Sequence, residues 1–105
     1  MLCIIRFVLS SLVVLWIPTV GVAQVTDMEQ GRRLYESQCG SCHGPQGNGG
    51  RGANLAQPQL RRASSDQALF NIIRRGIRGT GMPGSFLSPI QISSIAAYVR
   101  TLGQV

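Results

Sequence analysis

Residues 39–43 read CGSCH, with two cysteines three positions apart and a histidine directly after the second. This stretch constrains the chain more than any other, since such a group of side chains serves only a few kinds of site. Three remain open at first: a dithiol redox switch, a zinc site and covalent attachment of a haem. The rest of the chain has to decide among them.

The N-terminal block of residues 1–23 differs in composition from the rest of the chain. Arg6 is followed by an apolar run and then by small residues, which is typical of a secretory signal peptide cleaved after Ala23. The short run and Pro18 argue against a spanning helix, and an uncleaved membrane anchor is the alternative. Cys3 precedes the run and is expected to leave with the signal. We therefore expect a periplasmic or otherwise exported protein.

Residues 24–105 are expected to form one small domain whose apolar core alone gives marginal stability. Nine of the ten arginines lie in this part together with all four acidic residues, and the chain has no lysine. Export disfavours nucleic acid as a partner, so the positive charge favours either solubility or a face for an acidic protein. Six of the arginines lie between CGSCH and the later GTGMPG stretch: Arg51, Arg61, Arg62, Arg74, Arg75 and Arg78.

Helical periodicity and end signals predict three helices. The first covers about residues 27–38, opened by a capping box of Thr26 and Glu29, with Met28 on its inward face. It leads directly into CGSCH. Four aromatic side chains are expected in the core: Tyr35, Phe70, Phe86 and Tyr98.

The second and third helices have clear start and stop residues. Ser65 can cap the second helix, in which Leu69, Ile72 and Ile73 share a face, and Gly76 stops it. The third opens at Ser88 with Pro89 in the first position, carries Ile92, Ile95, Val99 and Leu102 on one face, and ends at Gly103.

Glycine-rich loops separate these helices, one over residues 44–64 and one containing GTGMPG. No alternating β-branched run is found after the signal segment, so the domain is predicted to be all-α. Gly47, Gly49 and Gly52 match the dinucleotide-binding pattern, but no strand precedes them. They are expected to let the backbone approach a cofactor closely.

The surroundings of CGSCH disfavour two of its three interpretations. A thioredoxin-like switch needs the cysteines at the start of a helix that follows a strand, whereas here a helix precedes them. A structural zinc site needs four ligands, and Cys39, Cys42 and His43 are the only cysteines and histidine after the signal.

Haem attachment accounts for all three side chains. Each sulfur of Cys39 and Cys42 would add to a porphyrin vinyl group, and His43 would bind the iron as proximal ligand. The haem would also supply most of the missing core. With no second histidine, methionine is the expected sixth ligand. Met82 in the GTGMPG loop is the candidate, since Met28 lies on a helix face.

The chain resembles a small bacterial class I cytochrome c from about Met28 to Leu102. The matching stretches are GRRLYESQCGSCHGPQGNGGRGANL, LFNIIRRGIRGTGMPG and ISSIAAYVRTLG. The resemblance implies a cytochrome c fold of three main helices and glycine-rich loops around one covalent haem c. It also implies that Gly31 and Tyr98 mark a close crossing of the first and last helices, that Tyr35 lies near the haem, and that the ligands are those named above.

One stretch departs from the family pattern. The family commonly has Gly-Pro-x-Leu after the glycine-rich loop, and the proline carbonyl accepts a hydrogen bond from the proximal histidine. Here the stretch is GANL, with Ala53 in the proline's place, which predicts a less fixed backbone and a less firmly oriented His43 ring. No tryptophan follows the signal, so an arginine between residues 51 and 78 is expected to bind a haem propionate.

These features predict an electron-transfer protein, with no enzymatic activity and no small-molecule substrate, that exchanges electrons with acidic redox partner proteins. Two alternatives stay open. One is a membrane-tethered subunit of a dehydrogenase or terminal oxidase, held by residues 1–23. The other is a haem sensor or enzyme with an open sixth position on the iron.

Overall fold

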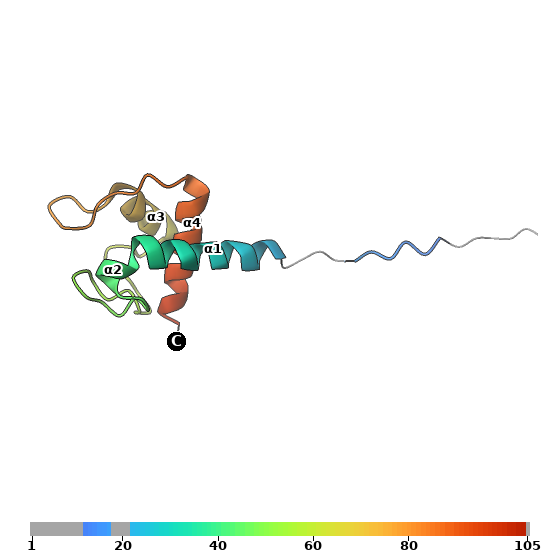
Figure 1. Ribbon diagram of the computed structural model, residues 1–105, viewed down its shortest axis with the longest axis horizontal. Coiled ribbons are helices and arrows are strands. Elements are labelled where there is room, and N and C mark those ends of the chain that lie inside the picture. The colour runs from blue at the N-terminus through green and yellow to red at the C-terminus, as the bar shows by residue number, and fades with distance from the viewer. Residues whose placement is uncertain (1–11, 18–21, 105) are drawn as a thin grey trace, which may run out of the picture.

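The computed structural model describes residues 12–17 and 22–104, with side chains of the second range from residue 27 onward. It contains four helices: α1 (Val22–Gln38), α2 (Gly40–His43), α3 (Asp66–Arg75) and α4 (Pro89–Leu102) (Figure 1). Within those ranges no residue belongs to a strand, which confirms the all-α prediction. Much of the expected signal segment, including Cys3, Arg6 and Pro18, lies outside the described residues.

Helix α1 begins at Val22, earlier than the sequence pattern predicted. Thr26 therefore lies inside the helix, and the predicted capping box of Thr26 and Glu29 is wrong. No glycine or proline lies between Val22 and Thr26 to stop the helix. The Glu29 carboxylate instead accepts hydrogen bonds from Arg32 and Arg33, and the Arg32 bond is the main cause that lowers the pKa of Glu29.

The first and last helices cross at a glycine, as the resemblance implied. A Cβ atom on residue 31 would lie 2.7 Å from the backbone carbonyl carbon of Ser94 and 3.1 Å from Cβ of Tyr98. Only glycine allows this approach of the α1 and α4 backbones. Next to the crossing, the rings of Tyr35 and Tyr98 pack in a tilted arrangement with centroids 5.4 Å apart.

Helices α3 and α4 begin and end where their capping signals predicted. The Ser65 hydroxyl accepts a hydrogen bond from the Ala68 amide, and Gly76 follows the last turn of α3 with φ of 71°. Ser88 and Gln91 form a capping box at the start of α4, with Pro89 in the first turn. The two helices pack against each other beside α1 (Figure 1).

The predicted apolar faces supply most of the core. The buried apolar residues are Tyr35, Ala63, Leu69, Ile73, Ile92, Ile95, Ala96 and Val99. Two expectations are wrong. Met28 is 37% exposed, because the N-terminal part of α1 projects past α4 (Figure 1). Phe86 is fully exposed rather than in the core, since its loop turns Leu87 inward instead.

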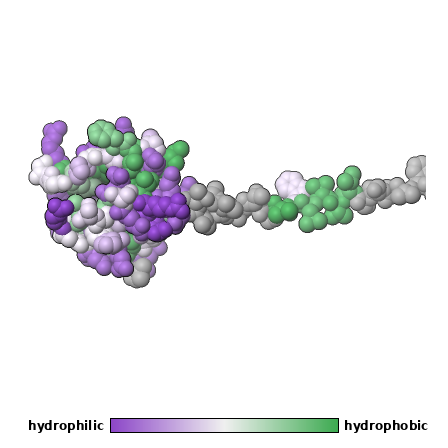
Figure 2. Space-filling view, in the orientation of Figure 1, coloured by the Kyte–Doolittle hydropathy of each residue, from purple (hydrophilic) through white to green (hydrophobic). Residues whose placement is uncertain are grey.

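Residues 12–17 form no regular secondary structure and expose apolar side chains, with Trp16 91% exposed. Figure 2 shows this hydrophobic stretch in contrast to the mostly polar surface of the helical part. Among the described residues, no helix combines the length and the apolar character that crossing a membrane requires.

Candidate cofactor site

The CGSCH stretch folds into the single turn of α2, immediately after α1. The Cys39 amide donates a hydrogen bond to the Tyr35 carbonyl, and the His43 amide donates one to the Cys39 carbonyl. This helical turn brings residues three and four positions apart to one side. Cys39, Cys42 and His43 consequently all line the same cavity, at the end of α1.

The His43 ring has a defined orientation. Its Nδ1 lies 2.8 Å from the carbonyl oxygen of Ala53, which can only accept, so Nδ1–H is the donor. The other ring nitrogen, Nε2, then carries the lone pair that a metal requires. The sequence predicted a less fixed ring because alanine replaces proline at this position. The structure nevertheless shows the hydrogen bond that the family pattern requires.

The absence of a side chain at Gly52 makes room for the His43 ring. A Cβ atom on residue 52 would lie 2.8 Å from both Nδ1 and Cε1 of the His43 ring. The Gly52 amide also donates a hydrogen bond of 2.7 Å to the Cys42 carbonyl, so the loop lies directly against α2. The sequence suggested that the glycines of this loop approach a cofactor, whereas Gly52 packs against the histidine itself.

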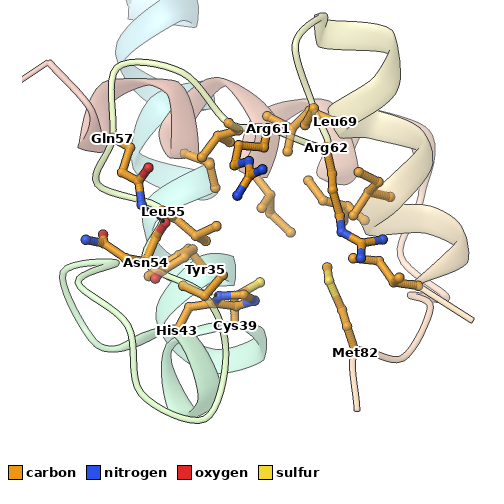
Figure 3. A pocket seen from close by; sticks show the side chains of 18 residues that line it. Tyr35, Cys39, His43, Asn54, Leu55, Gln57, Arg61, Arg62, Leu69 and Met82 are labelled. Atoms are coloured by element: carbon orange, nitrogen blue, oxygen red, sulfur yellow. Dashed lines mark hydrogen bonds between the residues drawn. The ribbon is translucent and has the colours of Figure 1, made fainter. Parts of the chain in front are cut away.

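Two adjacent cavities lie beside α2, with volumes of about 270 Å³ and 610 Å³. They share Cys39, His43, Met82 and the apolar side chains Ile73, Ile77 and Ile95 among their walls. In Figure 3, His43 and Cys39 lie on one side of the smaller cavity and Met82 lies on the other. An apolar cavity with a few convergent polar groups is the usual form of a cofactor site.

Hydrogen bonds within the loop that carries Met82 hold it in place. The Ile77 amide donates a hydrogen bond of 3.1 Å to the Met82 carbonyl, and the Met82 amide donates one of 3.3 Å to the Thr80 hydroxyl. Gly76 and Gly79 have positive φ angles of 71° and 77°, which allow the chain to turn here. The turn brings the half-buried Met82 side chain to the cavity.

Arginine side chains complete the walls. Arg61 and Arg62 line the smaller cavity and are drawn pointing into it in Figure 3, and Arg51 and Arg62 line the larger one. The side chains therefore fit a haem in three respects: soft and imidazole donors from opposite walls, apolar surface between them, and cations for its carboxylates.

The same geometry disfavours the other two interpretations of CGSCH. Burial raises the pKa of the Cys39 thiol, and nearby Cys42 adds to the shift, whereas a reactive dithiol needs a lowered pKa. Among the described residues, no group of three His, Cys, Asp or Glu side chains is arranged to hold a metal ion. A zinc site of protein ligands therefore lacks its ligand set.

Tyr35 links α1 to the loop that follows His43. It is fully buried, and its hydroxyl donates a hydrogen bond of 2.8 Å to the Gly44 carbonyl, just after His43. Burial, with smaller effects of Cys39 and Tyr98, raises its pKa to about 12. The tyrosine is therefore neutral at physiological pH, and it ties α1 to the start of the glycine-rich loop.

Comparison with known proteins supports a haem site. The family model described as "Cytochrome C oxidase, cbb3-type, subunit III" matches residues 26–99. The crystal structure of cytochrome cL from the marine methylotrophic bacterium Methylophaga aminisulfidivorans is similar, with 28% identity and a TM-score of 0.67 over 72% of this chain. Cytochrome cL from Hyphomicrobium denitrificans has 27% identity and a TM-score of 0.64 over 70% of this chain.

The extent of these matches differs between structures. The chain spans about half the length of the two cytochrome cL structures, covering 53% and 46% of them. A third solved structure, the c-type cytochrome NirC, is 26% identical with a TM-score of 0.59, and the match covers 77% of this chain and 93% of that one. No curated protein sequence matches the chain significantly.

Proposed function

Since the chain belongs to the cytochrome c family whose model is described as cbb3-type cytochrome c oxidase subunit III, we propose that it is a monohaem c-type cytochrome carrying single electrons between redox partners. One observation carries the proposal: His43, oriented by Ala53, and Met82 line one apolar cavity that Cys39 also borders. This arrangement serves reversible electron uptake and release rather than conversion of a substrate.

Each side chain of the site has a distinct role in this proposal. Cys39 and Cys42 would hold the haem covalently, each by adding its thiol S–H across one porphyrin vinyl group, an addition that needs no oxidant. His43 would bind the iron through Nε2, and Met82 would bind it through its sulfur. When bound, the haem supplies an iron that alternates between the ferric and ferrous states. Residues 24–105 form the haem-binding domain.

The protein contributes rigidity and exclusion of water. Two protein ligands leave no coordination position open for a substrate. The apolar walls formed by Ile73, Ile77 and Ile95 keep water away from the centre of the site. A thioether ligand favours the ferrous state, so we expect a higher reduction potential than with two histidines.

Covalent attachment is tested by intact mass spectrometry of the protein from a host that matures c-type haem. The wild type should carry the mass of one haem and retain its colour after acid denaturation. Cys39→Ala/Cys42→Ala should release any haem under the same denaturation. A wild-type protein that loses all its haem on denaturation would overturn the covalent assignment.

Carbon monoxide distinguishes an electron carrier from a haem sensor or enzyme. Met82 should block the sixth position, so the ferrous wild type should bind the gas only slowly at neutral pH, whereas Met82→Ala should bind it promptly. Prompt binding by the wild type would favour the sensor or enzyme with an open position.

Arg61 and Arg62 are proposed to bind the haem propionates, since they line the smaller cavity from the side that neither His43 nor Met82 occupies (Figure 3). Replacing both by glutamine should shift the pH dependence of the reduction potential, because the propionates would lose their cationic neighbours. An unchanged pH profile would exclude this role.

The proposed partners are proteins with acidic surfaces, reached outside the cytoplasm. A second candidate, a subunit tethered within an oxidase or dehydrogenase, is favoured by the family's description and by the exposed apolar side chains of residues 12–17. Mass spectrometry of the protein from its native membranes distinguishes the two: a chain that retains residues 1–23 supports the tethered subunit, and a chain cleaved after Ala23 supports the mobile carrier.

A further inference from the structure

Phe86 is exposed in a position where the local structure is well fixed. Its side chain has the full accessibility of a free residue, although the neighbouring Leu87 packs against the core. The Ser85 amide donates a hydrogen bond of 3.0 Å to the Arg74 carbonyl, and the Leu87 amide donates one of 3.1 Å to the Ser85 hydroxyl. Phe86 is therefore presented to solvent by a loop tied to α3.

The location of Phe86 connects it to the site. Together with Met82, Pro83 and Gly84 it lines the larger cavity, at whose other walls Cys42 and His43 lie. Aromatic side chains, methionine and arginine are enriched at protein–protein interfaces, so an exposed phenylalanine near Met82 is a candidate anchor.

Arginines without an ion pair to a described carboxylate lie at the end of α3, next to this loop. The four ion pairs of the described residues use only Arg32, Arg33 and Arg100 as cations. Arg74 and Arg75 at the end of α3, and Arg78 after it, are exposed and make no ion pair with a described carboxylate.

The backbone of Arg74 and Arg75 lies close to the loop that carries Phe86. A Cβ atom on residue 84 would lie 2.8 Å from the Arg74 carbonyl oxygen and 3.1 Å from the Arg75 carbonyl carbon. The last turn of α3, with the exposed Arg74 and Arg75, therefore lies directly against the loop that presents Phe86.

We propose that Phe86 is the apolar anchor of a docking surface, flanked by Arg74, Arg75 and Arg78, for a partner protein that presents an apolar hollow bordered by carboxylates. The inference rests on the proposed electron-transfer function and identifies where the partner binds. Charge complementarity selects the acidic partner and gives a fast, salt-dependent encounter, while burial of Phe86 gives the complex its specificity.

Gold electrodes coated with alkanethiols provide a defined probe of this surface. One coating carries only carboxylates, a second only methyl groups, and a third a mixture of the two. Affinity is measured as adsorbed mass on a microbalance and electron exchange by voltammetry, with haem-loaded protein throughout.

The variants are Phe86→Ser and Arg75→Gln. Their matched controls are Ile90→Ser, which removes an exposed apolar side chain outside both cavities, and Arg33→Gln, which makes the same charge change on α1.

The wild type should bind the mixed coating most tightly. Phe86→Ser should bind the mixed coating about tenfold more weakly, because burying a phenyl ring contributes a factor of about ten or more to affinity. Ile90→Ser should lose less than about twofold in affinity for the same coating. Arg75→Gln should weaken binding to carboxylates, and its effect should vanish at high salt, with Arg33→Gln showing a smaller effect.

Two results would overturn the docking surface: equal losses in Phe86→Ser and Ile90→Ser, or no loss in Phe86→Ser. If the second result came with an altered spectrum and reduction potential, Phe86 would be assigned to packing on the cofactor. Failure of the proposed function is a separate observation, because the wild type would then give no reversible one-electron wave on any coating.

Discussion

The imidazole of His43 lies against the backbone of Gly52, so closely that a methyl group on residue 52 would be 2.8 Å from Nδ1 and Cε1. The next residue, Ala53, accepts the hydrogen bond from Nδ1. Position 52 therefore controls how the ring is held, even though its own side chain is a hydrogen atom. The glycine and the carbonyl together fix the ring without the proline that the family commonly has at this place.

Gly52→Ala should displace the His43 ring and weaken its hydrogen bond to Ala53. We expect the free energy of unfolding of the haem-loaded protein to fall by about 1–3 kcal/mol, as for other overpacked sites. The reduction potential should rise, since a weaker hydrogen bond makes the imidazole a poorer donor. Gly81→Ala is the control, because a Cβ atom there meets nothing within 4 Å. Equal effects of the two substitutions would contradict the account.

Gly31→Ala should separate α1 from α4. The new methyl group would meet the Ser94 carbonyl and Tyr98 at the crossing, and neither backbone can move without losing contacts of the core. A loss of at least about 2 kcal/mol in the free energy of unfolding is expected from chemical denaturation, despite the better helix propensity of alanine. Gly40→Ala is the control, since its Cβ would make only ordinary contacts of 3.6 Å and 3.9 Å.

Tyr35 should make stability depend on pH in the alkaline range. Its pKa is raised to about 12, so the folded state keeps the phenol proton more tightly than the unfolded state does. The stabilisation is complete below about pH 10, the ordinary tyrosine pKa, and is lost as the pH rises to about 12.

Tyr35→Phe tests this dependence. At neutral pH the variant should lose about 0.5–1.5 kcal/mol with the hydrogen bond to Gly44. Its deficit relative to the wild type should shrink between about pH 10 and 12, measured by denaturant unfolding at each pH. A deficit that stays constant or grows over this range would show that the pKa of Tyr35 is not raised.

Arg100 of α4 forms two hydrogen bonds with the chain at the start of α3. Its guanidinium donates hydrogen bonds of 2.9 Å to the Ala63 carbonyl and 3.1 Å to the Asp66 carboxylate. Because Asp66 is almost fully exposed, the ion pair should contribute less than about 1 kcal/mol. The bond to the carbonyl of the buried Ala63 should contribute about 1.5–3 kcal/mol. Arg100→Gln should therefore destabilise the protein clearly more than Asp66→Asn, and a larger effect of Asp66→Asn would reverse this assignment.

The sequence predicted the regular parts of the fold because their signals are local. Ser65 and Ser88 cap the helix starts through their side chains, and Gly76 and Gly103 directly follow the last turns. The predicted start of α1 was wrong because a capping box is a local sequence pattern, and the helix can continue through it. Tertiary contacts decided the other errors: Met28 lies beyond the crossing with α4, and Phe86 faces away from the core that Leu87 enters.

The sequence identified candidate ligands of the site but not the contacts that support them. The candidates His43 and Met82 follow from spacing and elimination, and the structure places both on one cavity. The contact of Gly52 with the imidazole depends on how a loop without periodicity folds back onto α2, which no local pattern specifies. The only signal in the sequence was the small-residue run RGAN next to the histidine motif.

The central claim, a haem held by His43 and Met82, is tested most directly by the absorption spectrum of the ferric protein at neutral pH. The wild type should show the weak long-wavelength band of sulfur-to-iron charge transfer. Met28→Ala should keep the band, and Met82→Ala should lose it. A wild-type spectrum without the band, or a band that persists in Met82→Ala, would contradict the claim.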